Sequence, residues 1–190
     1  MSAQSALFLD RDGVINIDKG YVHKAEDCIF IDGIFDLVKR ANQLSYKVFV
    51  VTNQAGIARG YYTEAEFLSF SEWMKNEFKN HQAQIDEIYF CPHHPIHGIA
   101  EYLTNCDCRK PAPGLFLKAQ LAYAIDMKKS VMVGDNISDL DASMLADVNK
   151  HYLFISKQIE RKVTDSESQF AKDSNIKVIS SFDEVDLISD

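Results

Sequence analysis

The sequence lacks the features that mark membrane and secreted proteins. None of its apolar runs approaches the roughly 18 residues that a membrane-spanning helix requires. Its amino terminus does not show a basic segment followed by an apolar one, which is the layout of a secretion signal. We therefore expect a cytoplasmic protein that has no membrane partner.

Positive charge is also scarce in this chain. It carries 20 Lys and Arg residues against 28 Asp and Glu residues, a net charge of −8, so no overall field attracts nucleic acid. An anionic substrate would need a local cationic site. We expect a small-molecule substrate, no nucleic-acid partner and a monomeric protein.

Cysteine is rare, and its placement indicates a metal site. Four cysteines without a secretion signal argue against a disulfide framework. Cys28 stands apart and fits a small buried apolar residue. The others form two groups with histidine, and one imidazole with three thiolates matches a closed structural zinc site: Cys91, His93, Cys106 and Cys108. His94 and His97 compete with His93 as the ligand.

The remaining composition is that of an ordinary globular domain, and we expect one domain over residues 1–190. No internal repeat or low-complexity linker is present. Short apolar runs predict strands at Ala6–Leu9, Val48–Val51, Ile88–Phe90, Val131–Val133, Tyr152–Ile155 and Lys177–Ile179. Apolar spacing and capping residues predict helices at Ile34–Leu44, from the Thr63 capping box to Phe78, from Gly114 to Ile125, from Asp139 to Ala146 capped by Ser138, and near Phe182–Ile188. Residues 156–175 look the least structured.

Strands that alternate with helices predict an α/β fold with a parallel sheet and right-handed crossovers. The first strand ends in Asp10-Arg11-Asp12-Gly13, which places two acids where open α/β sheets gather their active-site groups. A nucleophile with its own acid is one interpretation of this pair. An ordinary turn is the other, since Asp and Gly favour turns.

Two further strand ends carry polar residues. The second predicted strand leads into Thr52-Asn53-Gln54-Ala55, whose hydroxyl and backbone N–H groups suit phosphate oxygens. Asp135 follows the fourth predicted strand, and beside Asp10 it would offer the oxygen ligands that Mg²⁺ prefers. Lys110 precedes a predicted helix and supplies a cation for phosphate.

These four segments occur in a recognisable order. Residues 10–139 contain, in this order, an Asp-x-Asp-Gly strand end, a strand-end Thr-Asn, a Lys before a helix and a Gly-Asp-x-x-x-Asp strand end. This order of motifs resembles that of the phosphatases of the haloacid dehalogenase superfamily. The resemblance implies a three-layer, Rossmann-like parallel sheet. The intervals between these motifs are too short for a substantial cap domain, so the active site should be open.

The same resemblance implies a role for each residue. Asp10 would attack phosphorus and form an aspartyl phosphate, while Asp12 would protonate the leaving oxygen and then activate water. Thr52 and Lys110 would hold the phosphoryl group. Catalytic Mg²⁺ would be bound by Asp10, Asp135 and the backbone carbonyl of Asp12.

Three segments narrow the resemblance to the heptose-bisphosphate phosphatase family: Asp-x-Gly-Tyr-Val-His from Asp18, Thr-Asn-Gln-x-Gly-Ile-Ala-Arg-Gly from Thr52, and the Cys-rich loop 91–108. This family removes the 7-phosphate of D-glycero-D-manno-heptose 1,7-bisphosphate for bacterial surface polysaccharide. By resemblance the substrate would be lined by Asp18, Lys19, Gly20, Tyr21, Thr52, Asn53, Gln54, Ala55, Arg109 and Lys110.

Arg109 has a physical reason to bind the phosphate that is not cleaved, because its planar fork can contact phosphate twice. The Cys-x-His pattern of these relatives favours His93 as the zinc ligand. Zinc would act as a scaffold, since Cys108 is followed directly by Arg109. Asn136 stands where the related sequences have Lys, so we expect a contact with substrate there through the backbone and not through the side chain.

Two other functions remain open from the sequence. Histidinol-phosphate phosphatases share the four motifs and a zinc loop, although that loop is typically shorter. A catalytically idle, zinc-stabilised binding module would keep the same fold. The intact set of Asp10, Asp12, Lys110 and Asp135 argues against this second alternative.

Overall fold

A computed structural model describes residues 4–158, 163–173 and 176–187 of the chain. Its centre is a six-stranded sheet in the order β3-β2-β1-β4-β5-β6, in which all neighbouring strands run parallel. The strands are β1 (Ala6–Leu9), β2 (Lys47–Asn53), β3 (Glu87–Cys91), β4 (Val131–Gly134), β5 (Lys150–Phe154) and β6 (Lys177–Ile179). Each predicted strand is confirmed within a few residues.

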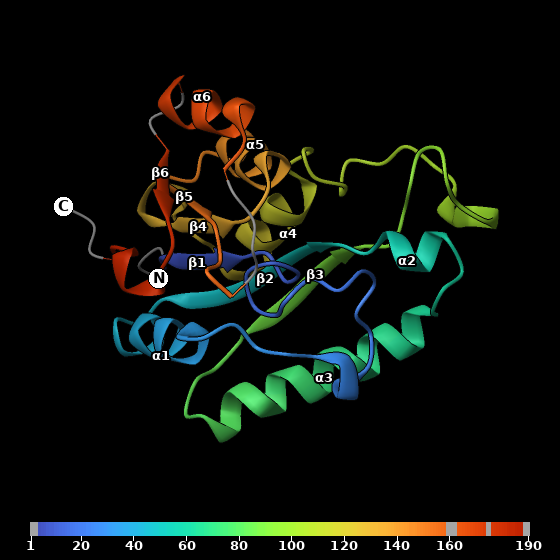
Figure 1. The fold of residues 1–190 in the computed structure, drawn as a ribbon, viewed down its shortest axis with the longest axis horizontal. Coiled ribbons are helices and arrows are strands. Elements are labelled where there is room, and N and C mark those ends of the chain that lie inside the picture. Colours follow the sequence, from blue (N-terminus) through green and yellow to red (C-terminus); the bar gives the residue numbers. More distant parts are fainter. Residues whose placement is uncertain (1–3, 159–162, 174–175, 188–190) are drawn as a thin grey trace.

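Helices cover both faces of the sheet, as Figure 1 shows. Side chains alternate along a strand, so Leu7 and Leu9 of β1 face one layer while Ala6 and Phe8 face the other. The first layer contains α1 (Ile34–Gln43) and α3 (Glu64–Asn80), and the second contains α4 (Gly114–Tyr123), α5 (Ile137–Leu145) and α6 (Asp165–Asp173). The predicted three-layer α/β fold is therefore confirmed.

Capping residues decide where several helices begin. The predicted capping box of α3 is present, with Thr63 and Glu66 each accepting from the other's backbone N–H. The prediction that Ser138 caps α5 was wrong. Asn136 caps this helix, because its side chain accepts from Ser138 and its own N–H donates to Asp139 at 3.0 Å.

Three further expectations differ from the structure. The segment after Thr52, for which no helix was predicted, contains the short helix α2 (Ala55–Ala58). The polar stretch 156–175 holds α6, which forms because Thr164 and Glu167 make a capping box and Ala171 packs on the core. The last predicted helix is a single 3₁₀ turn, Phe182–Glu184, and Ile188 lies outside the described residues.

The parallel sheet gathers the ends of β1, β2 and β4 at one edge. β1 lies between β2 and β4, so the chain leaves β1 where the strand order reverses, which is where open α/β sheets form a binding crevice. No large cap is evident over this edge in the described residues. The two long connections there, residues 10–33 and 92–113, each contain one 3₁₀ turn among the described residues, Ala25–Asp27 and Ala100–Tyr102.

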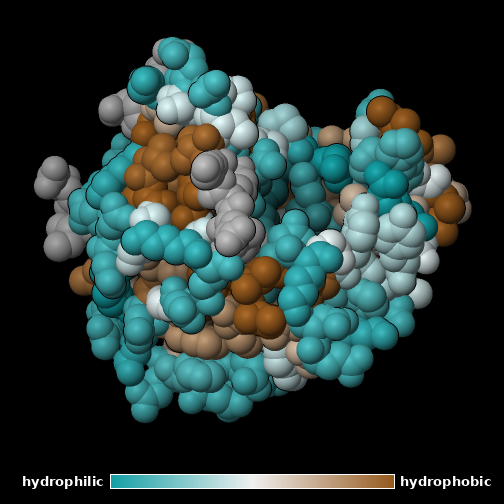
Figure 2. Space-filling view, viewed as in Figure 1, coloured by the Kyte–Doolittle hydropathy of each residue, from teal (hydrophilic) through white to brown (hydrophobic). Residues whose placement is uncertain are grey.

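The connection between β3 and α4 projects from the body of the protein (Figure 1). Its tip exposes Ile96, Ile99 and Leu103, and Figure 2 shows apolar surface there at the upper right.

None of the helices in the described ranges is long and apolar enough to cross a membrane.

Candidate active site

Asp10 directly follows β1 and lies at the centre of the crevice. Its N–H donates to Val133 of β4 at 3.1 Å, and the residue is only 8% exposed. Gly13 follows with φ of +87°, a conformation that L side chains rarely adopt. A Cβ at Gly13 would lie 2.2 Å from Asp135 Oδ2, so glycine allows this loop to approach the carboxylate that follows β4.

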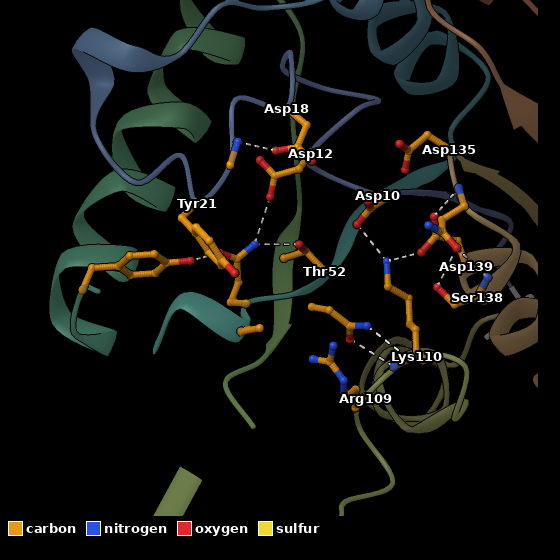
Figure 3. A pocket seen from close by; sticks show the side chains of 16 residues that line it. Asp10, Asp12, Asp18, Tyr21, Thr52, Arg109, Lys110, Asp135, Ser138 and Asp139 are labelled. Carbon is orange, nitrogen blue, oxygen red and sulfur yellow. Dashed lines mark hydrogen bonds and ion pairs between the residues drawn. The ribbon is translucent and has the colours of Figure 1, made fainter. Parts of the chain in front are cut away.

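Lys110 joins two carboxylates, that of Asp10 after β1 and that of Asp139 in the first turn of α5. Its buried Nζ lies 2.7 Å from Asp10 Oδ1, 2.7 Å from Asp139 Oδ1 and 2.7 Å from the Val51 carbonyl oxygen. Figure 3 shows the ammonium group between the two acids. Three donors are thus matched by three acceptors, which gives the side chain a fixed direction.

The main chain of Lys110 is fixed as well. Asn53, at the end of β2, accepts from the Lys110 N–H and donates to the Lys110 carbonyl, each at 3.0 Å. Arg109 Nη1 donates to the His93 carbonyl at 3.1 Å. The two cationic residues are therefore attached to the end of β2 and to the cysteine-rich loop.

Asp139 is a site residue that the sequence reasoning did not select. Its Oδ1 contacts Lys110, while its Oδ2 accepts from the N–H of Asn136 and so caps α5. Gly134 provides the space, because a Cβ there would lie 2.5 Å from the Asp139 Cβ. The second Asp of the Gly-Asp-x-x-x-Asp motif was the available signal.

Asp12 and Thr52 are connected by an amide. Gln54 is buried, and its Nε2 donates to Thr52 Oγ1 at 2.8 Å and to Asp12 Oδ2 at 3.3 Å. Tyr62, which the sequence reasoning did not select, donates to Gln54 Oε1 at 2.6 Å and so determines which end of the amide faces Asp12. Because Thr52 Oγ1 accepts from Gln54, its own hydroxyl proton is free to be donated elsewhere.

Burial and charge act against each other at the centre of the site. Burial raises the pKa of Asp10 to about 7, against the lowering effect of Lys110. Burial by itself would lower the pKa of Lys110, but Asp10 and Asp139 outweigh it and hold that pKa above its ordinary value. Lys110 therefore stays cationic, while Asp10 needs a second cation to be fully ionised near neutral pH.

The acids form a group whose chemistry fits a divalent cation. Carboxylate oxygens of Asp10, Asp135 and Asp139 lie within 4.8 Å of one another. Asp139 already uses one oxygen for Lys110 and the other for the helix cap. Asp10 and Asp135 are therefore the better placed of the three to hold Mg²⁺, which prefers oxygen ligands.

The predicted zinc ligands also come together. Sulfur to sulfur distances among Cys91, Cys106 and Cys108 are 3.1 to 3.5 Å, and His93 Nδ1 lies 3.4 Å from the Cys108 sulfur. His94 Nδ1 instead accepts from backbone N–H groups of its own loop. Burial raises the pKa of Cys91, so a cation would be needed to keep it as a thiolate. This donor set fits tetrahedral zinc.

The site opens into a cavity of about 470 Å³. Lys19 is exposed and does not line it. Four residues that were not selected from the sequence do: Tyr62, Asn136, Ser138 and Asp139. All other residues predicted for catalysis, substrate or Mg²⁺ are in the lining: Asp10, Asp12, Asp18, Gly20, Tyr21, Thr52, Asn53, Gln54, Ala55, Arg109, Lys110 and Asp135.

A comparison with protein families matches the polynucleotide kinase 3 phosphatase model over residues 8–180. Structural similarity agrees, with a TM-score of 0.77 and 30% identity to a haloacid dehalogenase-like phosphatase from Mesorhizobium loti, over 86% of this chain and 77% of that one. The chain belongs to this family of haloacid dehalogenase-type phosphatases.

More similar relatives act on one kind of sugar phosphate. D-glycero-beta-D-manno-heptose-1,7-bisphosphate 7-phosphatase from Vibrio cholerae is 48% identical over 151 residues, 80% of this chain and 81% of that protein. The D-glycero-alpha-D-manno-heptose-1,7-bisphosphate 7-phosphatase from Burkholderia mallei is 49% identical over 159 residues, 84% of each. The predicted resemblance to this group is confirmed.

One similar solved structure contains a metal ion and phosphate. The D,D-heptose 1,7-bisphosphate phosphatase from B. bronchiseptica, complexed with magnesium and phosphate, has a TM-score of 0.74. Its sequence is 26% identical, and the alignment covers 94% of both chains.

Proposed function

We propose that this chain is a Mg²⁺-dependent phosphatase that removes the 7-phosphate of D-glycero-D-manno-heptose 1,7-bisphosphate. The observation that carries the chemistry is Lys110, whose ammonium group lies 2.7 Å from Asp10 in a cavity that Asp12 and Thr52 also line. Relatives of both anomeric types, 48% and 49% identical, support the substrate class.

In the first half of the reaction an Asp10 oxygen forms a bond to phosphorus while the bond from phosphorus to the sugar oxygen breaks. Asp12 gives its proton to that oxygen, so the sugar leaves as an alcohol. In the second half Asp12 takes a proton from water, and the oxygen of that water forms a bond to phosphorus. The bond to Asp10 breaks, and inorganic phosphate is released.

The other residues position and neutralise the phosphoryl group. The Thr52 hydroxyl donates a hydrogen bond to a phosphoryl oxygen, and the Lys110 ammonium group, held by its own three acceptors, supplies positive charge beside the phosphoryl group. When bound by Asp10, Asp135 and the Asp12 carbonyl, Mg²⁺ would supply additional positive charge at the reacting oxygens. A positioned general acid typically contributes about 10²- to 10⁴-fold to the rate.

Substrate recognition is assigned to the rim of the cavity. Arg109 would bind the phosphate that is kept, since its guanidinium can contact phosphate with two donors. Asp18, Gly20 and Tyr21, on the loop after β1, also line the cavity and would contact the sugar. Zinc at the cysteine cluster would act only as a scaffold for Arg109 and Lys110.

We also propose that residues 1–190 form one catalytic domain, which acts as a monomer in the cytoplasm. The product would serve the synthesis of nucleotide-activated heptose for surface polysaccharide. These proposals rest on the sequence pattern and on the relatives.

Phosphate release with Mg²⁺ tests the proposal. We expect release from one or both anomers of the heptose bisphosphate with kcat/KM at least tenfold above that for histidinol phosphate, and a product that keeps its 1-phosphate by ³¹P NMR. A preference for histidinol phosphate would overturn the substrate. No release from any of them, nor from p-nitrophenyl phosphate, would favour a non-catalytic binding module.

A further inference from the structure

Arg11, between the two acids of the first motif in sequence, is buried where an arginine is costly. It is 1% exposed, and its guanidinium carbon lies 5.6 Å from the ring centroid of Phe67 and 5.3 Å from that of Phe70, both on α3. Its Nη2 donates to Asp12 Oδ2 at 2.5 Å and to the Val22 carbonyl at 2.7 Å. The aromatic rings and these two acceptors hold the guanidinium in one orientation.

Stability alone does not explain an arginine at this position. Removing a guanidinium from water is expensive, and an apolar side chain of similar size often serves a buried site as well or better. Among the described residues its Nε and Nη1 have no hydrogen-bond partner. It pairs with the carboxylate of Asp12, whose side chain is 21% exposed and faces the cavity.

Asp12 is held from several directions at once. Arg11 and Gln54 donate to its Oδ2, and Asn16 donates to its Oδ1 at 3.0 Å. Asn16 is fully buried, and its Nδ2 also donates to the Ile17 carbonyl, which ties it to the same loop. Both oxygens of the carboxylate therefore have a fixed donor, although the side chain borders an open cavity.

We propose that Arg11 is a positioning residue that aims the Asp12 carboxyl group, protonated in this step, at the leaving oxygen of the substrate. Arg11 does not line the cavity and acts through Asp12. This inference rests on the proposed function, in which Asp12 gives its proton to the sugar oxygen as the bond from that oxygen to phosphorus breaks. Without the guanidinium only the neutral amides of Gln54, at 3.3 Å, and Asn16, at 3.0 Å, hold the Asp12 side chain, and a misplacement of about 1 Å can cost about 10²-fold in rate.

Leaving-group dependence tests the proposal. An alkyl leaving group, as at C7 of the heptose, needs the proton, whereas p-nitrophenol can leave as its anion. The value of kcat/KM reports the steps up to departure of the leaving group. With Mg²⁺ and Zn²⁺ bound, we expect Arg11→Met to lower kcat/KM for the heptose bisphosphate about 10²-fold, and that for p-nitrophenyl phosphate less than about threefold.

Three further variants make this comparison specific. Arg40→Met is the matched control, since Arg40 also donates to a backbone carbonyl but lies away from the site, and the ratio of the two kcat/KM values should not change. Arg11→Lys keeps the charge without the planar fork, so the ratio should change in the same direction by a smaller factor. Asp12→Asn should change the ratio at least as much as Arg11→Met.

The outcomes separate two kinds of failure. If Asp12→Asn lowers kcat/KM equally for both substrates, Asp12 is not the acid, and the proposed mechanism fails together with the inference on Arg11. If Asp12→Asn changes the ratio of the two kcat/KM values but folded Arg11→Met does not, Arg11 has only a structural role and the inference is overturned. Should Arg11→Met not fold, an unchanged ratio in Arg11→Lys would overturn it instead.

Discussion

Asp10 combines burial, a cationic neighbour and the end of a strand, and these together suit it to be a nucleophile. Burial raises its pKa to about 7, while Lys110 contacts one of its oxygens. Lys110 keeps a second partner in Asp139. The site can therefore lose the Asp10 charge without leaving the ammonium group unpaired.

Asp10→Asn is expected to abolish turnover and to preserve the fold. The amide cannot form the aspartyl phosphate, but it has the same shape and leaves the contact between Lys110 and Asp139 intact. Phosphate release with Mg²⁺ measures the first effect, and near-ultraviolet circular dichroism measures the second. Near-normal release from the folded variant would contradict the assignment of Asp10.

Gly13→Ala is expected to weaken Mg²⁺ binding. The new Cβ would come within 2.2 Å of Asp135 Oδ2 and push this carboxylate away. Changes beside a metal ligand typically cost about 10- to 100-fold in affinity. The measurement is the Mg²⁺ concentration that gives half-maximal activity.

Gly33→Ala is the matched control for this substitution. Gly33 has a similar φ of +84°, but its nearest neighbour, Phe182 Cδ2, would lie at an ordinary 3.6 Å from the new Cβ. It should therefore carry the backbone strain without the effect on Mg²⁺. Equal Mg²⁺ dependence in the two variants would show that Gly13 does not control Asp135.

At the scale of elements, the segment between β3 and α4 shows how a structural metal can support catalysis. Cys91 belongs to β3, whereas Cys106 and Cys108 lie just before Lys110 and α4. A metal at this cluster would connect β3 to Lys110, for which we propose the role of neutralising phosphate. Structural zinc has apparent binding free energies of about 10 to 16 kcal/mol, enough to order a loop of this length.

Removal of zinc is expected to loosen residues 92–109 and to lower kcat at least tenfold with Mg²⁺ present, because Lys110 loses its support. Hydrogen exchange would follow the loop, and phosphate release would follow kcat. Cys108→Ser should behave like the zinc-free protein, whereas Cys28→Ala, outside the cluster, should not. Full turnover in a zinc-depleted preparation would show that zinc binding is not coupled to activity through Lys110.

Capping explains why helix ends were predicted unevenly. Thr63 and Glu66 form a single capping pair before an apolar pattern, so the start of α3 could be predicted from the sequence. Asn136 and Ser138 are two plausible caps that lie two positions apart, and the backbone conformation of Asn136 decides between them. The capping pair of α6, Thr164 and Glu167, is also present in the sequence. No helix was predicted there because the surrounding residues are mostly polar and show no apolar pattern.

At the scale of the whole molecule, His151 on β5 links stability to pH. Burial lowers its pKa from 6.5 to about 4. Between these values the unfolded chain binds more protons than the folded one, so the free energy of unfolding falls as pH falls. At pH 5 the loss would be at most about 2 kcal/mol.

His151→Gln should remove this dependence. Asp10 acts in the opposite sense in the metal-free protein, because its raised pKa makes the folded state lose stability as pH rises toward 7. The quantity to compare is therefore the difference between wild type and variant at pH 7 and at pH 5, from urea denaturation. An equal difference at both values would exclude His151.

The sequence by itself determined the parallel sheet, the order of its chemical motifs and nearly all of the cavity lining. These follow from local patterns: apolar runs that end in Asp or Thr, and cysteines at metal-like spacing. Only the tertiary structure decided that Asp139 pairs with Lys110, that Gln54 connects Thr52 to Asp12, and that Arg11 lies buried against α3. Such contacts join residues far apart in the chain, and their geometry is set by how the layers pack rather than by any local preference.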